Sequence, residues 1–180
     1  MTLKEHYEKH VIPAMKEQFG YKNNLAVPRI VKAMLNVGIS ASQKDPKVKE
    51  TIKDTIRTIS GQEPVERSAK KSISSFKIRK GQIVGMLVTL RGKRMYDFLD
   101  KLLHLTFPRM RDFRGLRKTM VDAHGNLTIG FREAVAFPEI KAGDLERQHG
   151  LEVTVVVGGA KGREEGVALL KLMGFPFTEK

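Results

Sequence analysis

Residues 83–91 read IVGMLVTLR, and residues 93–105 follow as KRMYDFLDKLLHL. The first stretch is rich in branched residues and alternates between two faces, which predicts a strand. One face of this strand carries Val84, Met86, Val88 and Leu90. In the second stretch, apolar residues recur every three or four positions, which predicts an amphipathic helix. The helix residues predicted to face the core are Met95, Phe98, Leu99, Leu102 and Leu103.

The rest of the chain continues this mixture of strands and helices. Three more helices are predicted: over residues 3–18 with a possible kink at Pro13, from Asp45-Pro46 to Ser60-Gly61, and over 164–173. The second of them is expected to bury Val48, Ile52, Ile56 and Ile59. Further strands are predicted at 28–37, within 62–82, at 126–131 and at 151–157.

Turn residues separate these elements. Asp122-Ala123-His124-Gly125 predicts a hairpin turn, and the basic segment 106–118, with Pro108 and Gly115, predicts a loop. The whole pattern predicts a single domain over residues 1–180 with a two-layer α+β fold. We expect a mainly antiparallel sheet with helices on one face and an RNA-binding surface on the opposite face, as in many RNA-binding domains.

The charge of the chain is concentrated in one segment. The 180 residues include 33 Lys and Arg and 20 Asp and Glu, a formal net charge of +13. Residues 67–118 hold fifteen Lys and Arg against three Asp, so nearly all of the excess lies there. A solvated basic face is one interpretation. Contact with phosphates is the interpretation we favour, because self-repulsion otherwise costs stability.

Composition also limits the kind of protein. The absence of Cys excludes disulfides and thiolate metal sites. The N-terminal residues lack an apolar signal core, and the longest apolar stretch, 151–157, is far shorter than the roughly 20 residues of a membrane helix. We therefore predict a cytoplasmic protein with no membrane partner.

No catalytic signature emerges, so we predict no catalytic residues, no cofactor and no bound metal. His6 and His10 are four residues apart on a predicted helix, but a third ligand is missing. The glycines of 158–166 follow a strand and precede a helix, and Gly159-Ala160-Lys161-Gly162 matches a short phosphate-contacting pattern. The spacing departs from the known phosphate loops, so a simple flexible turn is the favoured interpretation.

Two basic stretches have a composition suited to binding. Residues 72–81 read SISSFKIRKG and place one aromatic ring among cations and hydroxyls. Phe76 is expected either to stack on RNA or to lie in the core beneath a disordered basic tip, and chemistry alone favours neither. Residues 108–115 read PRMRDFRG, which suits phosphate or protein contacts, or a solvated loop anchored by Phe113.

Several long stretches resemble one family closely. They are Leu35-Asn36-Val37-Gly38, residues 70–81, residues 88–100, residues 108–115, Phe137-Pro138-Glu139-Ile140 and residues 169–177. Together they resemble the bacterial large-subunit ribosomal proteins numbered five, the family that binds 5S ribosomal RNA. The resemblance spans essentially the whole chain, with a mild departure at 157–163, where many members carry a link richer in Thr and acids.

The resemblance implies a structural role in the large ribosomal subunit. Members of the family help to attach 5S rRNA in the central protuberance, beside 23S rRNA and neighbouring large-subunit proteins. They also contact the P-site tRNA and a protein of the small-subunit head, which forms an intersubunit bridge. They are not enzymes.

The resemblance also implies roles for particular residues. Asn36, Gln62 and Thr89 match the positions of the family that contact 5S rRNA, and Lys32 and Arg91 are suited to phosphates. The tRNA-contacting loop is expected to use Phe76, Lys77, Arg79 and Lys80. The contact with the small subunit is expected to use Arg109, Arg111, Phe113 and Arg114.

Other functions remain as alternatives. An RNA-modifying enzyme would need a cofactor loop or an activated nucleophile, and the sequence offers neither. A membrane-surface protein would need a basic helix with an apolar face, whereas the cations here cluster mostly in strands and loops. A free-standing basic RNA-binding regulator is the third alternative. We also expect the loop around Phe76 to be mobile when the protein is isolated, because it has little to bury.

Overall fold

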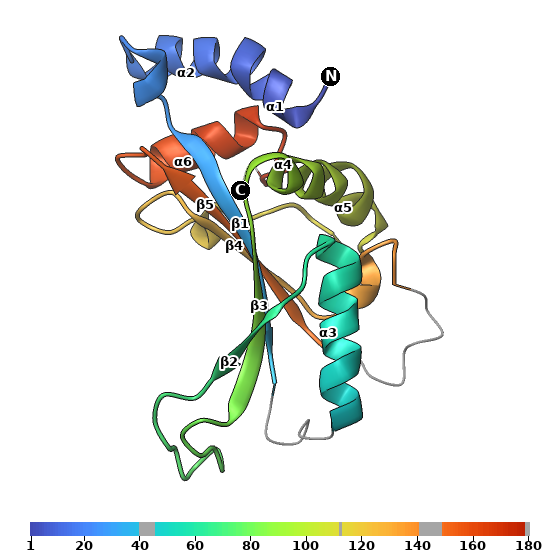
Figure 1. The fold of residues 1–180 in the computed structure, drawn as a ribbon. Helices are drawn as coiled ribbons and strands as arrows, with labels where there is room; N and C mark the ends of the chain where they lie inside the picture. Colours follow the sequence, from blue (N-terminus) through green and yellow to red (C-terminus); the bar gives the residue numbers. More distant parts are fainter. Residues whose placement is uncertain (40–45, 112, 141–148, 179–180) are drawn as a thin grey trace. The chain divides into compact units, whose positions relative to one another are not determined.

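The computed structural model of the protein describes residues 1–39, 46–111, 113–140 and 149–178. Figure 1 shows the helices and strands along the chain. In chain order they are α1 (Leu3–His6), the π-helical turn η1 (Tyr7–Val11), α2 (Ile12–Phe19), η2 (Asn24–Ala26), β1 (Arg29–Gly38), α3 (Pro46–Ser60), β2 (Val65–Ser68), β3 (Ile83–Leu90), α4 (Gly92–Lys101), the π-helical turn η4 (Leu102–Thr106), α5 (Phe107–Arg109), η5 (Lys118–Met120), β4 (Leu127–Phe131), η6 (Ala134–Ala136), β5 (Leu151–Gly158) and α6 (Arg163–Leu172).

The strands form one five-stranded antiparallel sheet in the order β2-β3-β1-β5-β4. Burial alternates along its strands: β1 buries Ala33, Leu35 and Val37 and leaves the residues between them half exposed. β4 and β5 alternate in the same way. A sheet with one buried face and one accessible face, combined with helices, confirms the predicted α+β class.

The chain groups into two compact units. Unit 1 consists of Met1–Ala33, Leu90–Ile129 and Thr154–Lys180, and unit 2 consists of Met34–Thr89 and Gly130–Val153. Each unit combines segments that are distant in sequence, and β1, β3, β4 and β5 contribute residues to both. The prediction of a single domain over residues 1–180 stays a prediction.

Unit 1 contains two helices that each include a π-helical turn just before a proline. The N–H of Ile12 bonds to the carbonyl of Tyr7, and the N–H of Phe107 bonds to that of Leu102. Pro13 and Pro108 follow directly. Because proline lacks an N–H and its ring crowds the preceding turn, the wider π turn lets each helix continue past it.

This arrangement corrects one prediction and confirms others. The predicted loop at 106–118 is wrong for residues 106–109, which are helical, since η4 ends at Thr106 and α5 extends to Arg109. The predicted core residues of the helix, namely Met95, Phe98, Leu99, Leu102 and Leu103, are all buried. The first helix ends at Gly20, whose left-handed backbone (φ +71°) suits glycine.

Unit 2 contains α3, β2, nearly all of β3 and one end each of β1, β4 and β5. α3 buries Ile52, Ile56 and Ile59 as predicted, whereas Val48 is only half buried. The helix begins at Pro46, and the predicted cap at Asp45 lies outside the described residues. Within the described ranges, no helix of either unit has the length and apolar character needed to cross a membrane.

Candidate RNA interface

The predicted 5S-contacting residues of unit 2 lie on accessible positions of the sheet or beside it. Asn36 of β1 lies between two buried neighbours and is half exposed, and Thr89 of β3 is half exposed in the same way. Gln62 follows α3, and its Nε2 donates a hydrogen bond of 3.3 Å to the carbonyl of Thr89. The structure therefore joins Gln62 and Thr89 directly.

A glycine borders Asn36. A Cβ at Gly85 would lie 3.0 Å from the carbonyl oxygen of Val37 and 3.9 Å from Oδ1 of Asn36. Because Gly85 has no side chain, none crowds the Asn36 amide at this point. A half-exposed amide can bond 2′-hydroxyls and base edges, which is the chemistry expected at this position.

The corner that holds Gln62 is fixed by hydrogen bonds and by charge. The Ser60 hydroxyl donates to the carbonyl of Ile56 at 2.6 Å and accepts from the N–H of Gln62 at 3.2 Å. Lys53 Nζ lies 2.7 Å from the carboxylate of Glu63. The hydrogen bond to Lys53 lowers the pKa of Glu63, and the same bond raises the pKa of Lys53.

The two cations assigned to 5S rRNA belong to unit 1. Lys32 is half exposed on β1, and Arg91 is exposed in an extended conformation (φ −139°) just before α4. Neither side chain has an ion pair with a carboxylate in the described part of the chain. Both are therefore available to bind phosphates.

The predicted tRNA-contacting loop is a β-hairpin tip between β2 and β3. Ile73 and Ile78 exchange backbone hydrogen bonds of 2.9 and 3.1 Å, and the N–H of Lys77 bonds to the carbonyl of Ser74 at 3.0 Å. Lys77 has a positive φ of 50°. Phe76 is 66% exposed, which excludes its alternative place in the core. The expected mobility of this loop stays a prediction.

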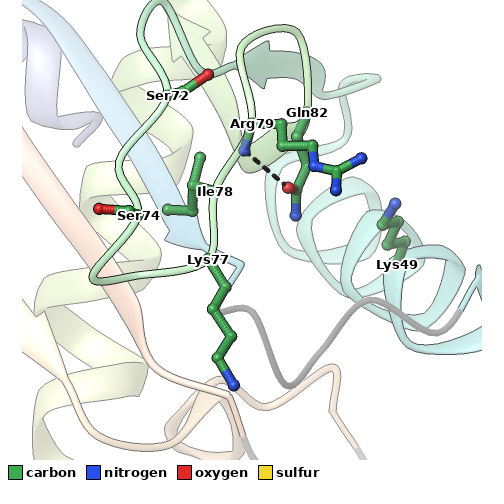
Figure 2. A pocket seen from close by; sticks show the side chains of 7 residues that line it. All are labelled: Lys49, Ser72, Ser74, Lys77, Ile78, Arg79 and Gln82. Carbon is green, nitrogen blue, oxygen red and sulfur yellow. Dashed lines mark hydrogen bonds between the residues drawn. The ribbon is translucent and has the colours of Figure 1, made fainter.

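A cavity of about 880 Å³ lies beside this hairpin in unit 2 (Figure 2). It is lined by Lys49, Ser72, Ser74, Lys77, Ile78, Arg79 and Gln82. The structure thus brings two predicted residues, Lys77 and Arg79, together with Lys49 of α3, whereas the predicted Phe76 and Lys80 are not in its lining. Lys49 and Gln82 are absent from the sequence-based prediction.

The sequence contains only a weak signal for Lys49. It lies three residues before the buried Ile52, on a helix whose later cations, Lys53 and Arg57, both face Glu63. The residues three and four positions after Lys49 are Ile52 and Lys53, so no carboxylate follows it on its own side of the helix. The sequence therefore shows that Lys49 has no acidic neighbour further along its helix face. It does not show that the hairpin of residues 72–82 lies beside Lys49.

The predicted small-subunit contact lies in unit 1. Arg109, Arg111 and Arg114 are exposed, and the ring of Phe113 stacks on Phe107 with centroids 4.9 Å apart. The Thr178 hydroxyl donates to the carbonyl of Arg114 at 2.8 Å. The segment is thus anchored by a ring and by the C-terminal chain while its guanidinium groups face solvent. Asp112 lies outside the described residues.

Two motifs that suggested other chemistry have structural explanations. The His6 and His10 rings stack 5.2 Å apart, and His6 Nε2 lies 2.9 Å from the carbonyl oxygen of Leu172. In the described ranges, no three His, Cys, Asp or Glu side chains gather as metal ligands. In the glycine run, a Cβ on Gly158 would lie 2.6 Å from Val31 Cγ2, so close packing explains this glycine.

Comparison with known proteins identifies the family. Residues 23–79 match the family described as Ribosomal protein L5, and residues 83–177 match the C-terminus of the same ribosomal family. A protein of Caldanaerobacter subterraneus is 46% identical over 177 residues, with 98% of both chains covered. A protein of Chloroflexus aurantiacus is 45% identical over 179 residues, with 99% of both covered. One of Microcystis aeruginosa is 46% identical over 175 residues, with 97% of both covered.

All three relatives carry the name Large ribosomal subunit protein uL5. The resemblance derived from the sequence is therefore confirmed. The relatives are structural ribosomal proteins, which also confirms the prediction that this chain is not an enzyme. The two family matches extend through both units and include the residues predicted to contact RNA except Lys80, which lies between the matched ranges. On this basis, the chain belongs to the ribosomal protein L5 family.

Proposed function

We propose that this chain binds 5S rRNA and helps to attach it in the central protuberance of the large ribosomal subunit. As a member of its family, the chain is a structural constituent of the large subunit, located on cytoplasmic ribosomes in bacteria. Ribosomal RNA and ribosomal proteins are its partners. We propose 5S rRNA as the specific partner, with 23S rRNA and neighbouring large-subunit proteins around it.

The observation that carries this proposal is that Asn36, Gln62 and Thr89 all hold half-exposed polar side chains in unit 2. They are two amides and a hydroxyl, and the Gln62 amide donates a hydrogen bond to the backbone carbonyl of Thr89. Groups of this kind read RNA by its 2′-hydroxyls and base edges, whereas cations contribute affinity through phosphates. We therefore assign selectivity to Asn36, Gln62 and Thr89, and phosphate contacts to Lys32 and Arg91.

The two roles are separable by experiment. Lys32→Ala and Arg91→Ala should each flatten the dependence of log affinity on log salt by roughly 0.7–0.9, the value for one lost phosphate contact. Lys9→Ala, which removes an exposed cation from η1, is the matched control and should leave the slope unchanged. An unchanged slope in both test variants would show that neither residue contacts phosphate.

We further propose that the hairpin tip contacts the P-site tRNA through Phe76, Lys77, Arg79 and Lys80. The support is the exposure of Phe76 and the three cations near it. An exposed aromatic ring among cations is suited to a nucleic acid, because the ring stacks on a base while the cations bind the backbone.

Arg109, Arg111, Phe113 and Arg114 are proposed to contact a protein of the small-subunit head. The support is the exposure of three guanidinium groups on a segment that Phe113 and the C-terminal chain hold in place. Arginine on an anchored segment favours protein interfaces, because its planar group forms paired hydrogen bonds with little loss of entropy.

A free-standing RNA-binding regulator would use the same basic surface without selectivity for 5S rRNA. Binding to 5S rRNA and to an unrelated RNA of equal length therefore separates the two functions. Membership in a family of structural proteins argues against an RNA-modifying enzyme.

A further inference from the structure

The described residues that line the cavity beside the hairpin include cations and no acid. The two cations that carry the argument are Lys49 and Arg79. In Figure 2 the side chains of Lys49 and Arg79 point toward the same space beside Gln82. Cations that converge without a carboxylate repel each other, so an anion in this space would stabilise the arrangement.

The lack of a carboxylate is specific to this part of α3. One and two turns further along the helix, Lys53 and Arg57 lie 2.7 and 3.7 Å from the carboxylate of Glu63. Lys49 and Arg79 have no ion pair with any carboxylate in the described part of the chain. Glu63 therefore pairs with the cations near the C-terminal end of α3, and Lys49 remains able to bind another anionic group.

The polar groups of the cavity are oriented as donors. Oε1 of Gln82 accepts the backbone N–H of Arg79 at 3.3 Å, which leaves the amide N–H groups of Gln82 to donate. Oγ of Ser72 accepts the backbone N–H of Lys80 at 3.0 Å, which leaves its hydroxyl proton to donate. With each of these oxygens engaged by a backbone N–H, Ser72 and Gln82 still offer O–H and N–H donors beside the two cations.

We infer that this cavity is a binding pocket for a phosphate group, in which Lys49 and Arg79 supply charge and Ser72 and Gln82 supply hydrogen bonds. Hydrogen-bond donors beside two cations fit the oxygens of phosphate. The phosphate belongs either to an RNA backbone or to a small phosphorylated solute. If the phosphate belongs to RNA, the pocket extends the proposed tRNA contact to α3, and the inference then rests on that proposed contact. If it belongs to a small solute, the inference is independent of the tRNA contact.

Inorganic pyrophosphate is a direct probe, because its binding requires no RNA. We would titrate it into the full chain and follow backbone amide signals by NMR. The expected result is that the signals of residues 49, 72, 79 and 82 shift together. Lys49→Gln should weaken this binding about fivefold, as expected for the loss of one accessible ion pair, and Lys49→Arg should restore it.

Lys71→Gln is the matched control, because Lys71 is an exposed cation of the same hairpin arm that does not line the cavity. It should leave pyrophosphate binding unchanged. The inference is overturned if the four signals do not shift, if Lys49→Gln binds as the wild type does, or if Lys71→Gln weakens binding equally.

A second arm adds tRNA to the complex with pyrophosphate. Displacement of pyrophosphate from these four amides would support an RNA phosphate as the natural occupant. Simultaneous binding of both would support a small phosphorylated solute. Failure of the chain to select 5S rRNA would contradict the proposed function but would not affect the pyrophosphate result, so the two failures are distinguishable.

Discussion

Gly166 of α6 lies directly against the backbone of Gly125 in the turn before β4. A Cβ on Gly166 would come within 2.7 Å of the Gly125 carbonyl oxygen and 2.9 Å of its carbonyl carbon. A Cβ on Gly125 would in turn lie 3.1 Å from Cα of Gly166. The two glycines thus let a helix and a turn of unit 1 touch backbone to backbone. This contact explains Gly166, which the sequence analysis assigned to a flexible turn.

This contact makes Gly166→Ala a specific test of the fold. The added methyl group would meet backbone atoms that cannot move aside, so we expect a loss of about 1–3 kcal/mol in the free energy of unfolding. Urea denaturation measures it. Gly162→Ala is the control, because a Cβ there meets no atom within 4 Å. Equal stability of the two variants would show that the close approach does not exist.

Asp122 should make the stability of unit 1 depend on pH. Its carboxylate accepts the backbone N–H groups of His124 and Asn126 at 2.8 and 2.9 Å. Burial alone would raise the pKa of Asp122, but these bonds and that of the Asn126 side chain lower it below the ordinary value of an aspartate. The stabilisation by the Asp122 carboxylate is therefore complete above the ordinary pKa of an aspartate, and it is lost as pH falls through the lowered pKa of Asp122.

Asp122→Ala should cost about 1 kcal/mol at pH 7, and this cost should shrink as pH falls through the lowered pKa of Asp122, because protonation of the wild-type carboxyl removes most of the same interaction. Denaturant titrations of both proteins over a falling series of pH values measure the difference. A cost that does not change with pH would contradict the assigned role.

The elements of this fold were largely predictable, because hydrophobic periodicity marks every long strand and helix. The continuation of the helix past Thr106 was not, since Pro108 ordinarily ends a helix and only η4 shows how it is accommodated. Gly166 was not predictable either, because its reason is a neighbour forty-one positions away in sequence. Local rules fail where a distant contact decides the conformation.

Replacement of Phe76 should weaken tRNA binding without destabilising the protein. Because its ring is 66% exposed, Phe76→Ala should change the free energy of unfolding by less than about 0.5 kcal/mol. The affinity of the Phe76→Ala protein for tRNA should nevertheless fall about five- to tenfold, as expected for one lost stacking contact. Leu25→Ala is the control, since Leu25 is an exposed apolar residue outside the hairpin. Unchanged tRNA affinity in Phe76→Ala would remove this ring from the proposed contact.

The arginines of the small-subunit contact should affect subunit joining alone. Arg111→Gln should leave the protein as stable as the wild type, because the side chain is exposed. Ribosomes that carry it should join their subunits about two- to fivefold less tightly, as for one charged contact at the rim of an interface. Light scattering at limiting magnesium measures joining. Arg163→Gln, at the exposed start of α6, is the control, and an equal effect of both would contradict the assignment.

The candidate site was only partly predictable from the sequence. Chemistry identified the basic stretches, and the resemblance supplied Asn36, Gln62 and Thr89. Neither source distinguished an exposed Phe76 from a buried one, because an aromatic residue in a basic loop suits both environments. Lys49 was missed for a different reason: its role depends on the position of a hairpin more than twenty residues further along the chain.

Selective binding of 5S rRNA is the central claim, and a gel-shift titration at moderate salt tests it most directly. The purified protein is titrated with 5S rRNA and with an unrelated RNA of equal length. We predict tight binding to 5S rRNA alone, with selectivity reduced in turn by Asn36→Ala, Gln62→Ala and Thr89→Val. Equal affinity of the wild-type protein for both RNAs would contradict the claim and would show that charge alone drives its binding.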